Sequence, residues 1–307
     1  MKIAYLILAH NTPAHLGRLI SALSTSSASF FVHVDKNSEI ADYQAARQAG
    51  DVTFIEPRIR VYWGDFSQVQ AILMLIRAAL ADERRFDRFV LLSGADYPLR
   101  SAAEIERFFA ADPDKEFMNL VPMPYEGKPI SRLINYKLRP GTPRPLRAVQ
   151  RGLMVLRLLP RERDYKRCFG ELLPYAGSTW WALSREACEY VSSFAAREKG
   201  WVRFHEHTRC PDESFFQTIV GNSPLRPRIA RNLTWADWSR EGGAKGAGSP
   251  ATLGLSHMPY LVSDPSFDEK VIYGAGPILF ARKFRNDSAE LVVSIDRHIA
   301  ERAAQRA

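Results

Sequence analysis

Two adjacent carboxylates, Asp212 and Glu213, stand in the stretch CPDESFFQT at residues 210–218. A carboxylate that faces a cavity can take a proton from a hydroxyl group, which is general-base catalysis. The same pair could instead begin a helix. Pro211 stops the preceding structure, aspartate is a good N-cap, and the helix dipole favours an acid in the first turn. The stretch alone leaves both interpretations open.

A second group of interest is the cationic pair Arg282-Lys283, which lies between Phe280 and Phe284. Charges inside an apolar stretch are costly to bury without a partner. One interpretation is a diphosphate clamp, in which arginine gives bidentate contacts and lysine a point charge. The other is two solvent-facing charges on a strand edge.

Two further clusters could hold a metal. Asp112-Pro113-Asp114 has the Asp-x-Asp spacing, but it follows a predicted helix rather than a strand, and its proline suggests a turn. His205-Glu206-His207 with Cys210 contains metal-ligating types, but its spacing fits no common zinc pattern. A metal-dependent transferase or hydrolase built on either cluster is therefore a rival interpretation.

Several common enzyme motifs are missing from the sequence. It has no Walker lysine loop and no Gly-x-Gly-x-x-Gly after a strand, which argues against a P-loop kinase and a dehydrogenase. It has no Gly-x-Ser-x-Gly, which argues against a serine hydrolase.

The elements that must position these residues follow from the apolar patterns. They predict strands at 3–9, 30–34, 52–55 and 89–92, with helices at 14–24, 67–82 and 102–110. This order predicts an α/β fold with a mostly parallel sheet flanked by helices. Further helices are predicted at 146–159, at 184–196 and from about 288. No linker interrupts the chain, so we expect a single domain, 1–307.

Polar residues follow the predicted strands at one edge of this sheet. His10 and Asn11 come after the first strand, Asp35 after the second and Asp96 after the strand at 89–92. Ligands of such sheets bind beyond the carboxyl ends of the strands. We therefore expect a nucleotide or nucleotide-sugar pocket here, although each residue could also serve a turn or a helix cap.

The amino-acid composition limits the class of protein that the sequence can encode. The 307 residues are 46% hydrophobic and 25% charged, which is ordinary for a soluble globular protein. No apolar run reaches the ~18 residues that a membrane span needs. The N-terminus lacks a signal-peptide cleavage site, and three widely spaced cysteines argue against a disulfide framework. We expect a cytoplasmic protein.

The formal charge of +8 is unevenly placed. Residues 128–167 hold twelve Lys/Arg and two acids, so this segment carries 12 − 2 = +10 and the rest of the chain 8 − 10 = −2. One interpretation is a solvated face. The other is a peripheral contact with the anionic inner face of the cell membrane, because Arg144, Arg147 and Arg151 flank the apolar side of a predicted helix. We expect no nucleic-acid partner.

Six segments, taken together and in order, resemble one enzyme family. They are VHVDKNS (32–38), WGDFSQVQ (63–70), LLSGADYPLR (91–100), GSTWWALSRE (177–186), PDESFFQT (211–218) and FARKF (280–284). The chain is similar to the core-2/I-branching β-1,6-N-acetylglucosaminyltransferases and the peptide O-xylosyltransferases, as a bacterial-type member. The similarity extends over nearly the whole chain.

This resemblance implies a GT-A-like fold and an inverting transferase that uses a UDP-sugar and no metal or other cofactor. It implies a nucleotide-binding half at 1–125 and an acceptor-side half at 126–307. Glu213 takes the position of the catalytic base, and Arg282 and Lys283 take those of the diphosphate-binding residues. The predicted donor-site residues are His10, Asn11, Val34, Asp35, Trp63 and Asp96, and the predicted sugar or acceptor residues are Trp180 and Trp181.

The donor is the finer question. Xylosyltransferase-like members tend to have an aspartate where this chain has Thr179, so UDP-N-acetylglucosamine is the favoured donor, with UDP-xylose and UDP-glucuronic acid as alternatives. The expected acceptor is a hydroxyl group of a glycan or of a lipid-linked saccharide. A rival of another class is a nucleotide-sugar or glycan-binding protein without turnover, which would not need Glu213.

Overall fold

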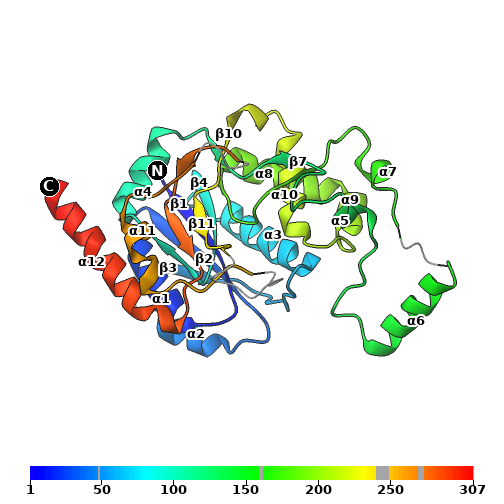
Figure 1. The fold of residues 1–307 in the computed structure, drawn as a ribbon, viewed down its shortest axis with the longest axis horizontal. Coiled ribbons are helices and arrows are strands. Elements are labelled where there is room, and N and C mark those ends of the chain that lie inside the picture. The colour runs from blue at the N-terminus through cyan, green and yellow to red at the C-terminus, as the bar shows by residue number, and fades with distance from the viewer. Residues whose placement is uncertain (48, 159–161, 240–248, 269–272, 307) are drawn as a thin grey trace.

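The structure is a computed structural model that describes residues 1–47, 49–158, 162–239, 249–268 and 273–306 (Figure 1). Its first part alternates strands and helices. These elements are β1 (Ile3–Ala9), α1 (Pro13–Leu23), β2 (Ala28–Val34), α2 (Ile40–Ala46), β3 (Asp51–Phe54), α3 (Phe66–Ala81), β4 (Arg88–Ser93), β5 (Asp96–Pro98) and α4 (Ala102–Ala111).

The second part is less regular, with strands of two or three residues and helices of very different lengths. They are β6 (Glu116–Phe117), β7 (Val121–Pro122), α5 (Ser131–Ile134), α6 (Arg144–Val155), α7 (Tyr165–Phe169), β8 (Tyr175–Ala176), β9 (Ala182–Ser184), α8 (Arg185–Arg197), α9 (Lys199–His205), the 3₁₀ helix η1 (Pro211–Glu213), α10 (Phe215–Gly221), β10 (Ile229–Ala230), β11 (Thr234–Ala236), α11 (Met258–Val262), β12 (Ser266–Phe267), β13 (Gly276–Pro277), β14 (Phe280–Arg282) and α12 (Ala289–Arg306).

A seven-stranded sheet in the order β10-β6-β9-β4-β1-β2-β3 forms the centre of the molecule. Strands β4, β1, β2 and β3 pair in parallel, whereas β9 is antiparallel to both of its neighbours. In register, Tyr5 of β1 lies opposite Phe30 of β2 and Val90 of β4. The predicted fold class, α/β with a mostly parallel sheet flanked by helices, is confirmed.

The side chains of β1 alternate between the two buried faces of the central sheet. Tyr5 and Ile7 join one buried cluster with residues of α1, α4 and α12, and Ala4 and Leu6 join a second cluster with residues of α3, α8 and α10. Successive side chains of a strand point to opposite faces, so a strand covered on both sides must be apolar throughout. This explains the continuous apolar run that begins the chain.

Helix starts are set by local chemistry. Ser101 and Glu104 form a reciprocal capping box at α4, and Asp65 accepts from the Ser67 amide at the start of α3. Pro13 takes the first position of α1, where no amide hydrogen is needed. Because α1 directly follows β1, the loop between them lies at the carboxyl edge of the central sheet.

The prediction missed α2 and β9. Of the seven residues of α2 only Tyr43 is buried, so no apolar period marks this helix in the sequence. β9 has three residues and inserts between β4 and β6. Because β9 and β10 come from 126–307, the two predicted halves share the central sheet.

Helix α6 stands apart from the body of the molecule (Figure 1). None of its residues is buried. Several of its apolar side chains and of those just after it are exposed, with 56% of Leu146, 58% of Val149 and 68% of Leu156 exposed, whereas Leu153 and Met154 are half-buried. The predicted helix at 146–159 therefore exists, but it ends at Val155, and the described chain leaves much of its apolar face uncovered.

Cys168, Cys188 and Cys210 are free thiols. Among the described helices, none combines the length and the apolar character that crossing a membrane requires.

Candidate active site

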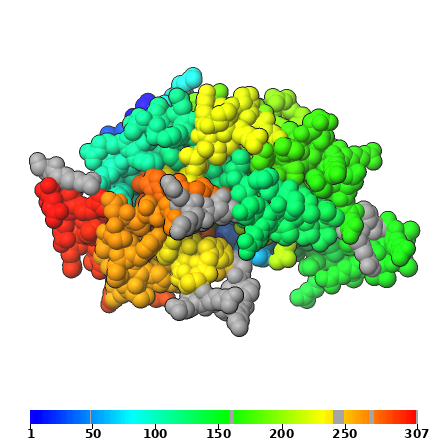
Figure 2. Space-filling model, turned by 45° about the horizontal axis from the view of Figure 1, so that its top comes forward, coloured from blue at the N-terminus to red at the C-terminus, as the bar shows by residue number. Residues whose placement is uncertain are grey.

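A cavity of about 1190 Å³ lies beyond the carboxyl ends of β1, β2 and β4. His10 follows β1, Asp35 follows β2 and Ser93 ends β4, and all three line it. Figure 2 shows a hollow between the teal segment on one side and the yellow and orange segments on the other. Small-molecule sites usually measure roughly 300–1,000 Å³, so this cavity has room for more than one ligand.

One side of the cavity is cationic. Arg282 at the end of β14 donates through Nε to Asp96 Oδ1 at 3.0 Å, and its guanidinium carbon lies 4.3 Å from the Trp180 ring centroid. Asp96 is fully buried and is itself held by the amide and hydroxyl of Ser93 at 3.0 and 2.5 Å. The ion pair and the cation–π contact fix the direction of the arginine fork.

Lys283 follows directly and donates through Nζ to the Ser249 hydroxyl at 2.5 Å. No carboxylate of the described chain forms an ion pair with it. Burial, together with the nearby charges of Arg282 and Arg285, lowers the pKa of Lys283 to about 8. An anion bound here would relieve this crowding of positive charge, so this side of the cavity suits a diphosphate.

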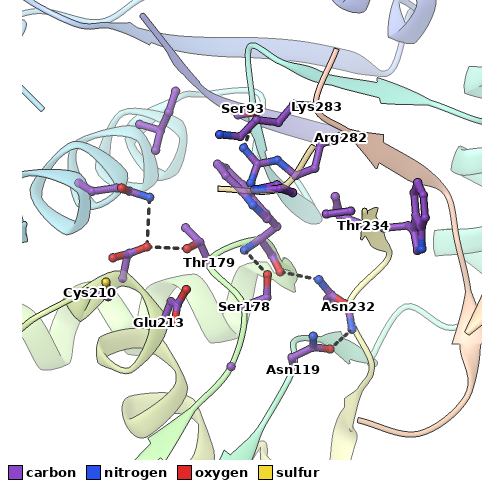
Figure 3. A pocket seen from close by; sticks show the side chains of 18 of the residues that line it. Ser93, Asn119, Ser178, Thr179, Cys210, Glu213, Asn232, Thr234, Arg282 and Lys283 are labelled. Atoms are coloured by element: carbon purple, nitrogen blue, oxygen red, sulfur yellow. Dashed lines mark hydrogen bonds between the residues drawn. The ribbon is translucent and has the colours of Figure 1, made fainter. Parts of the chain in front are cut away.

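Across the pocket lies Glu213 (Figure 3). Its Oε2 accepts from Lys128 Nζ and from Arg132 Nη1, both at 2.5 Å, whereas no donor of the described residues reaches Oε1. Burial alone would raise the pKa of Glu213, but the two cations outweigh it and lower the pKa. Glu213 is therefore ionised at neutral pH and keeps one oxygen for a ligand.

The backbone of η1 sets the direction of Glu213. The Glu213 carbonyl accepts from the Gly177 amide at 2.9 Å, and the Gly177 carbonyl accepts from Lys128 Nζ at 2.7 Å. A Cβ at position 177 would lie 1.8 Å from the Asn119 carbonyl oxygen, so only glycine fits there. Gly177 thus hydrogen-bonds both to the backbone of Glu213 and to Lys128, one of the two cations that pair with the Glu213 carboxylate.

Asp212 does not cap a helix, and the capping interpretation is wrong. The following helix, α10, begins after Ser214, and its start has no side-chain cap. The Asp212 carboxylate instead accepts through Oδ2 from Thr179 Oγ1 at 2.6 Å and from Gln68 Nε2 at 3.2 Å. Burial, and then the charge of Glu213, raise the pKa of Asp212 to about 6.

Asp35 holds a loop at the cavity wall. Its two oxygens accept from the amides of Asn37 and Val61, both at 2.7 Å. His10 also lines the cavity, and burial followed by the charge of Lys283 lowers its pKa. Trp63 stands at the rim, 64% exposed.

The cavity therefore brings together seven of the predicted residues. They are His10, Asp35, Trp63, Trp180, Glu213, Arg282 and Lys283.

The four others do not line it. Val34 is fully buried in β2, and Trp181 packs in the core 5.9 Å from the Phe216 ring. Asp96 lies behind Arg282, and Asn11 contacts the Thr12 hydroxyl at 3.4 Å. Asp96 can act on a ligand only through the arginine it holds.

The two candidate metal clusters are dispersed. Asp112 pairs with Lys115 at 2.8 Å, away from the cavity lining. His205 is fully buried against Trp201, and burial lowers its pKa to about 3, whereas His207 stacks on Tyr136 at 4.4 Å. Within the described part of the chain, no group of three or more His, Cys, Asp or Glu could hold a metal ion.

Lys128 and Arg132 are site residues that the sequence did not single out, because they were counted with the basic segment 128–167. Other members of that segment are also used internally. Arg139 lies 3.8 Å from Asp65, and Arg163 donates to three groups around Thr208. Arg161 lies outside the described residues. The exposed positive charge of this segment lies on α6 and just after it, at Arg144, Arg151 and Arg157, and on α7, at Lys166 and Arg167.

Comparison with known proteins gives a family match. The model of the family described as "Branch: Core-2/I-Branching enzyme" matches residues 3–262. The chain is 28% identical to Xylosyltransferase 2 of Canis lupus familiaris over 97% of its own length and 34% of that protein. It is also 28% identical to Xylosyltransferase 1 of the same species, over 80% of the chain and 25% of that protein. The chain thus spans about a third of one relative and a quarter of the other.

Similarity to solved structures is weak. The apo crystal structure of mouse xyloside xylosyltransferase 1 overlaps 92% of this chain and 97% of that one, at 11% identity. The TM-score of this match is 0.35.

Proposed function

Because the chain belongs to the Core-2/I-branching enzyme family, as its six motifs predict, we propose that it is a glycosyltransferase that moves a sugar from a UDP-sugar to a hydroxyl group of a glycan acceptor. The observation that carries the proposal is the arrangement within one cavity. Arg282 and Lys283 form a cationic side, and Glu213 offers a free carboxylate oxygen across from them (Figure 3).

In this mechanism Oε1 of Glu213 takes the proton of the acceptor hydroxyl while the oxygen attacks the anomeric carbon of the sugar. The bond from that carbon to the diphosphate breaks, and UDP leaves from the opposite face, so an α-linked donor gives a β-linked product. Negative charge grows on the leaving diphosphate, where Arg282 and Lys283 stabilise it. General-base assistance typically contributes ~10²–10⁴ in rate.

We propose that no metal is needed for this step. The support is Lys283, a cation without a carboxylate partner in the described chain, beside an arginine whose direction is fixed by Asp96. Two fixed cations can supply the charge stabilisation that a divalent ion would otherwise give to a leaving diphosphate.

For the donor we propose UDP-N-acetylglucosamine first. Thr179, which stands where xylosyltransferase-like members tend to have aspartate, favours this choice. The similarity to proteins named xylosyltransferases supports UDP-xylose as the alternative, and UDP-glucuronic acid is a second one. The Asp212 carboxylate accepts a hydrogen bond from the Thr179 hydroxyl at 2.6 Å. A carboxylate therefore stands beside position 179 in the cavity wall, although position 179 itself is a threonine.

The test is UDP release by the purified protein with each UDP-sugar and a panel of glycan acceptors, with and without EDTA. Release that persists in EDTA supports the proposal. Release that EDTA abolishes would support a metal-dependent enzyme. UDP-sugar binding without release, across the acceptor panel, would support a binding protein.

We further propose that α6 holds the enzyme peripherally at an anionic membrane, where lipid-linked acceptors are found. Residues 144–158 carry four arginines, at 144, 147, 151 and 157, and no acid, and most of the apolar side chains among them are exposed. An exposed amphipathic helix with a basic polar face suits the interface of an anionic leaflet. Each basic residue there is worth about 1 kcal/mol.

The experiment is co-sedimentation with anionic and neutral vesicles at low and high salt. Binding should require anionic lipid and weaken with salt. Changing Arg144, Arg147 and Arg151 to glutamate should abolish it, whereas the same change at three exposed arginines elsewhere should weaken it far less; those are Arg77, Arg107 and Arg297. Equal effects of the two triple variants would refute a specific role of α6.

A further inference from the structure

Asp212 is a cavity-lining carboxylate that uses only one of its oxygens. Oδ2 accepts from Thr179 and Gln68, whereas Oδ1 is buried and no donor of the described residues reaches it. The residue is 5% exposed and forms no ion pair with a described cation. Buried acceptors in folded proteins nearly always have a partner, so Oδ1 of this cavity-lining residue is left for a donor that a ligand can supply.

Its place in the wall says which part of a ligand it faces. Arg282 stacks on Trp180. Thr179, which precedes Trp180 in the sequence, donates a hydrogen bond to Asp212. Asp212 is in turn the sequence neighbour of Glu213. In the proposed reaction the transferred sugar lies between the diphosphate and the attacking oxygen. It must therefore lie between Arg282 and Glu213, along the stretch that Asp212 lines.

We propose that Asp212 is a specificity-determining residue whose Oδ1 accepts a hydrogen bond from a hydroxyl of the donor's sugar ring. This inference rests on the proposed function and names a contact within the same site. An ionised carboxylate can only accept, so the group that it recognises must be a donor. Thr179 and Gln68 hold Oδ2 from two sides and thereby fix the direction of Oδ1.

The roles of the two carboxylates differ because their partners differ. Glu213 is paired with two cations, which keep it ionised, and its other oxygen has no donor among the described residues. Asp212 has two neutral donors and is almost enclosed, so it lacks the access to solvent and acceptor that a base needs. A sugar hydroxyl would give it the third hydrogen bond that its buried oxygen lacks.

The first experiment compares the affinity of UDP with that of the UDP-sugar that proves to be the donor, in the unmodified protein and in Asp212→Asn. The asparagine keeps its oxygen toward Thr179 and Gln68 and turns an NH₂ donor toward the sugar hydroxyl. UDP affinity should stay the same, and UDP-sugar affinity should fall at least ~10-fold. Asp114→Asn, an exposed change of the same kind, should alter neither.

The second experiment starts from the unmodified protein. Donor analogues that each lack one ring hydroxyl are titrated against the unmodified protein, and one of them should bind at least ~10-fold more weakly than the complete donor. The same analogue should lose little in Asp212→Asn, which makes a double-mutant cycle between the hydroxyl and the carboxylate.

The outcomes separate this inference from the proposed function. If UDP does not bind at all, the proposed function fails. If UDP binds but Asp212→Asn weakens UDP and the UDP-sugar equally, or raises only the KM of the acceptor, the assignment of Asp212 is overturned while the transferase proposal stands. A full set of deoxy analogues that bind as well as the complete donor would overturn it as well.

Discussion

The pKa of Lys283 gives the proposed diphosphate site a pH dependence that can be measured. Burial, and then Arg282 and Arg285, lower this pKa from 10.5 to about 8. The charged form of Lys283 is thus disfavoured in the free protein, and a bound diphosphate favours it. UDP affinity should therefore be highest below pH 8 and should fall as the pH rises through 8.

The magnitude follows from the titration. A group with a pKa near 8 is about ten times less protonated at pH 9 than at pH 7. If UDP binds only the protonated form, its affinity falls about tenfold over this interval, or ~1.4 kcal/mol. Uridine has no diphosphate, so its affinity should not follow the charge of Lys283.

The assay is isothermal titration calorimetry of UDP and uridine at pH 7, 8 and 9. Lys283→Arg keeps its charge throughout and should flatten the pH dependence of UDP binding. Lys283→Met should flatten it as well, at a weaker affinity. UDP affinity that is constant from pH 7 to 9, or that falls equally in Lys283→Arg, would refute a contact between Lys283 and the diphosphate.

Two further predictions concern the loop that holds the carboxylate. Lys128→Met should move the acid limb of the kcat–pH profile to higher pH, because it removes one of the two cations that lower the pKa of Glu213. If the acid limb does not move, Glu213 is not the group that titrates in catalysis. Gly177→Ala should lose ~1–3 kcal/mol of unfolding free energy in urea, because its Cβ would overlap the Asn119 carbonyl. Gly152→Ala, a matched change in α6 with open space around the new Cβ, should cost nothing.

Sequence patterns located the cavity because strand ends are set by local signals. The continuous apolar run of β1 stops at Ala9, and the mostly apolar β2 stops at Val34, so the residues that follow them, His10 and Asp35, lie at the carboxyl edge. Parallel pairing of the two strands then brings these residues to one side. Nothing beyond the period of the side chains and the order of the elements is needed for this part of the site.

Neighbouring residues of one motif are harder to assign. Trp180 lines the cavity and Trp181 packs in the core, because successive residues of an extended segment face opposite ways. The same alternation turns Val34 inward beside Asp35. A motif fixes the segment, and only the packing of both faces decides which of its side chains reaches a ligand.

The partners of charged residues were the least predictable, because the sequence does not show which group lies next to a given charge in the fold. Lys128 and Arg132 looked like part of a basic surface, yet they lie 2.5 Å from Glu213, which is more than 80 residues away in sequence. Asp212 looked like a helix cap, yet its partners Thr179 and Gln68 come from distant segments. Such long-range pairs depend on the tertiary fold.

The central claim, that Glu213 is the base of a transferase reaction, is tested most directly by Glu213→Gln. We predict that the variant binds UDP as the unmodified protein does but releases UDP from the donor in the presence of acceptor and EDTA at least ~10²-fold more slowly. Near-normal turnover with intact UDP binding would contradict the claim and leave Glu213 with a structural role.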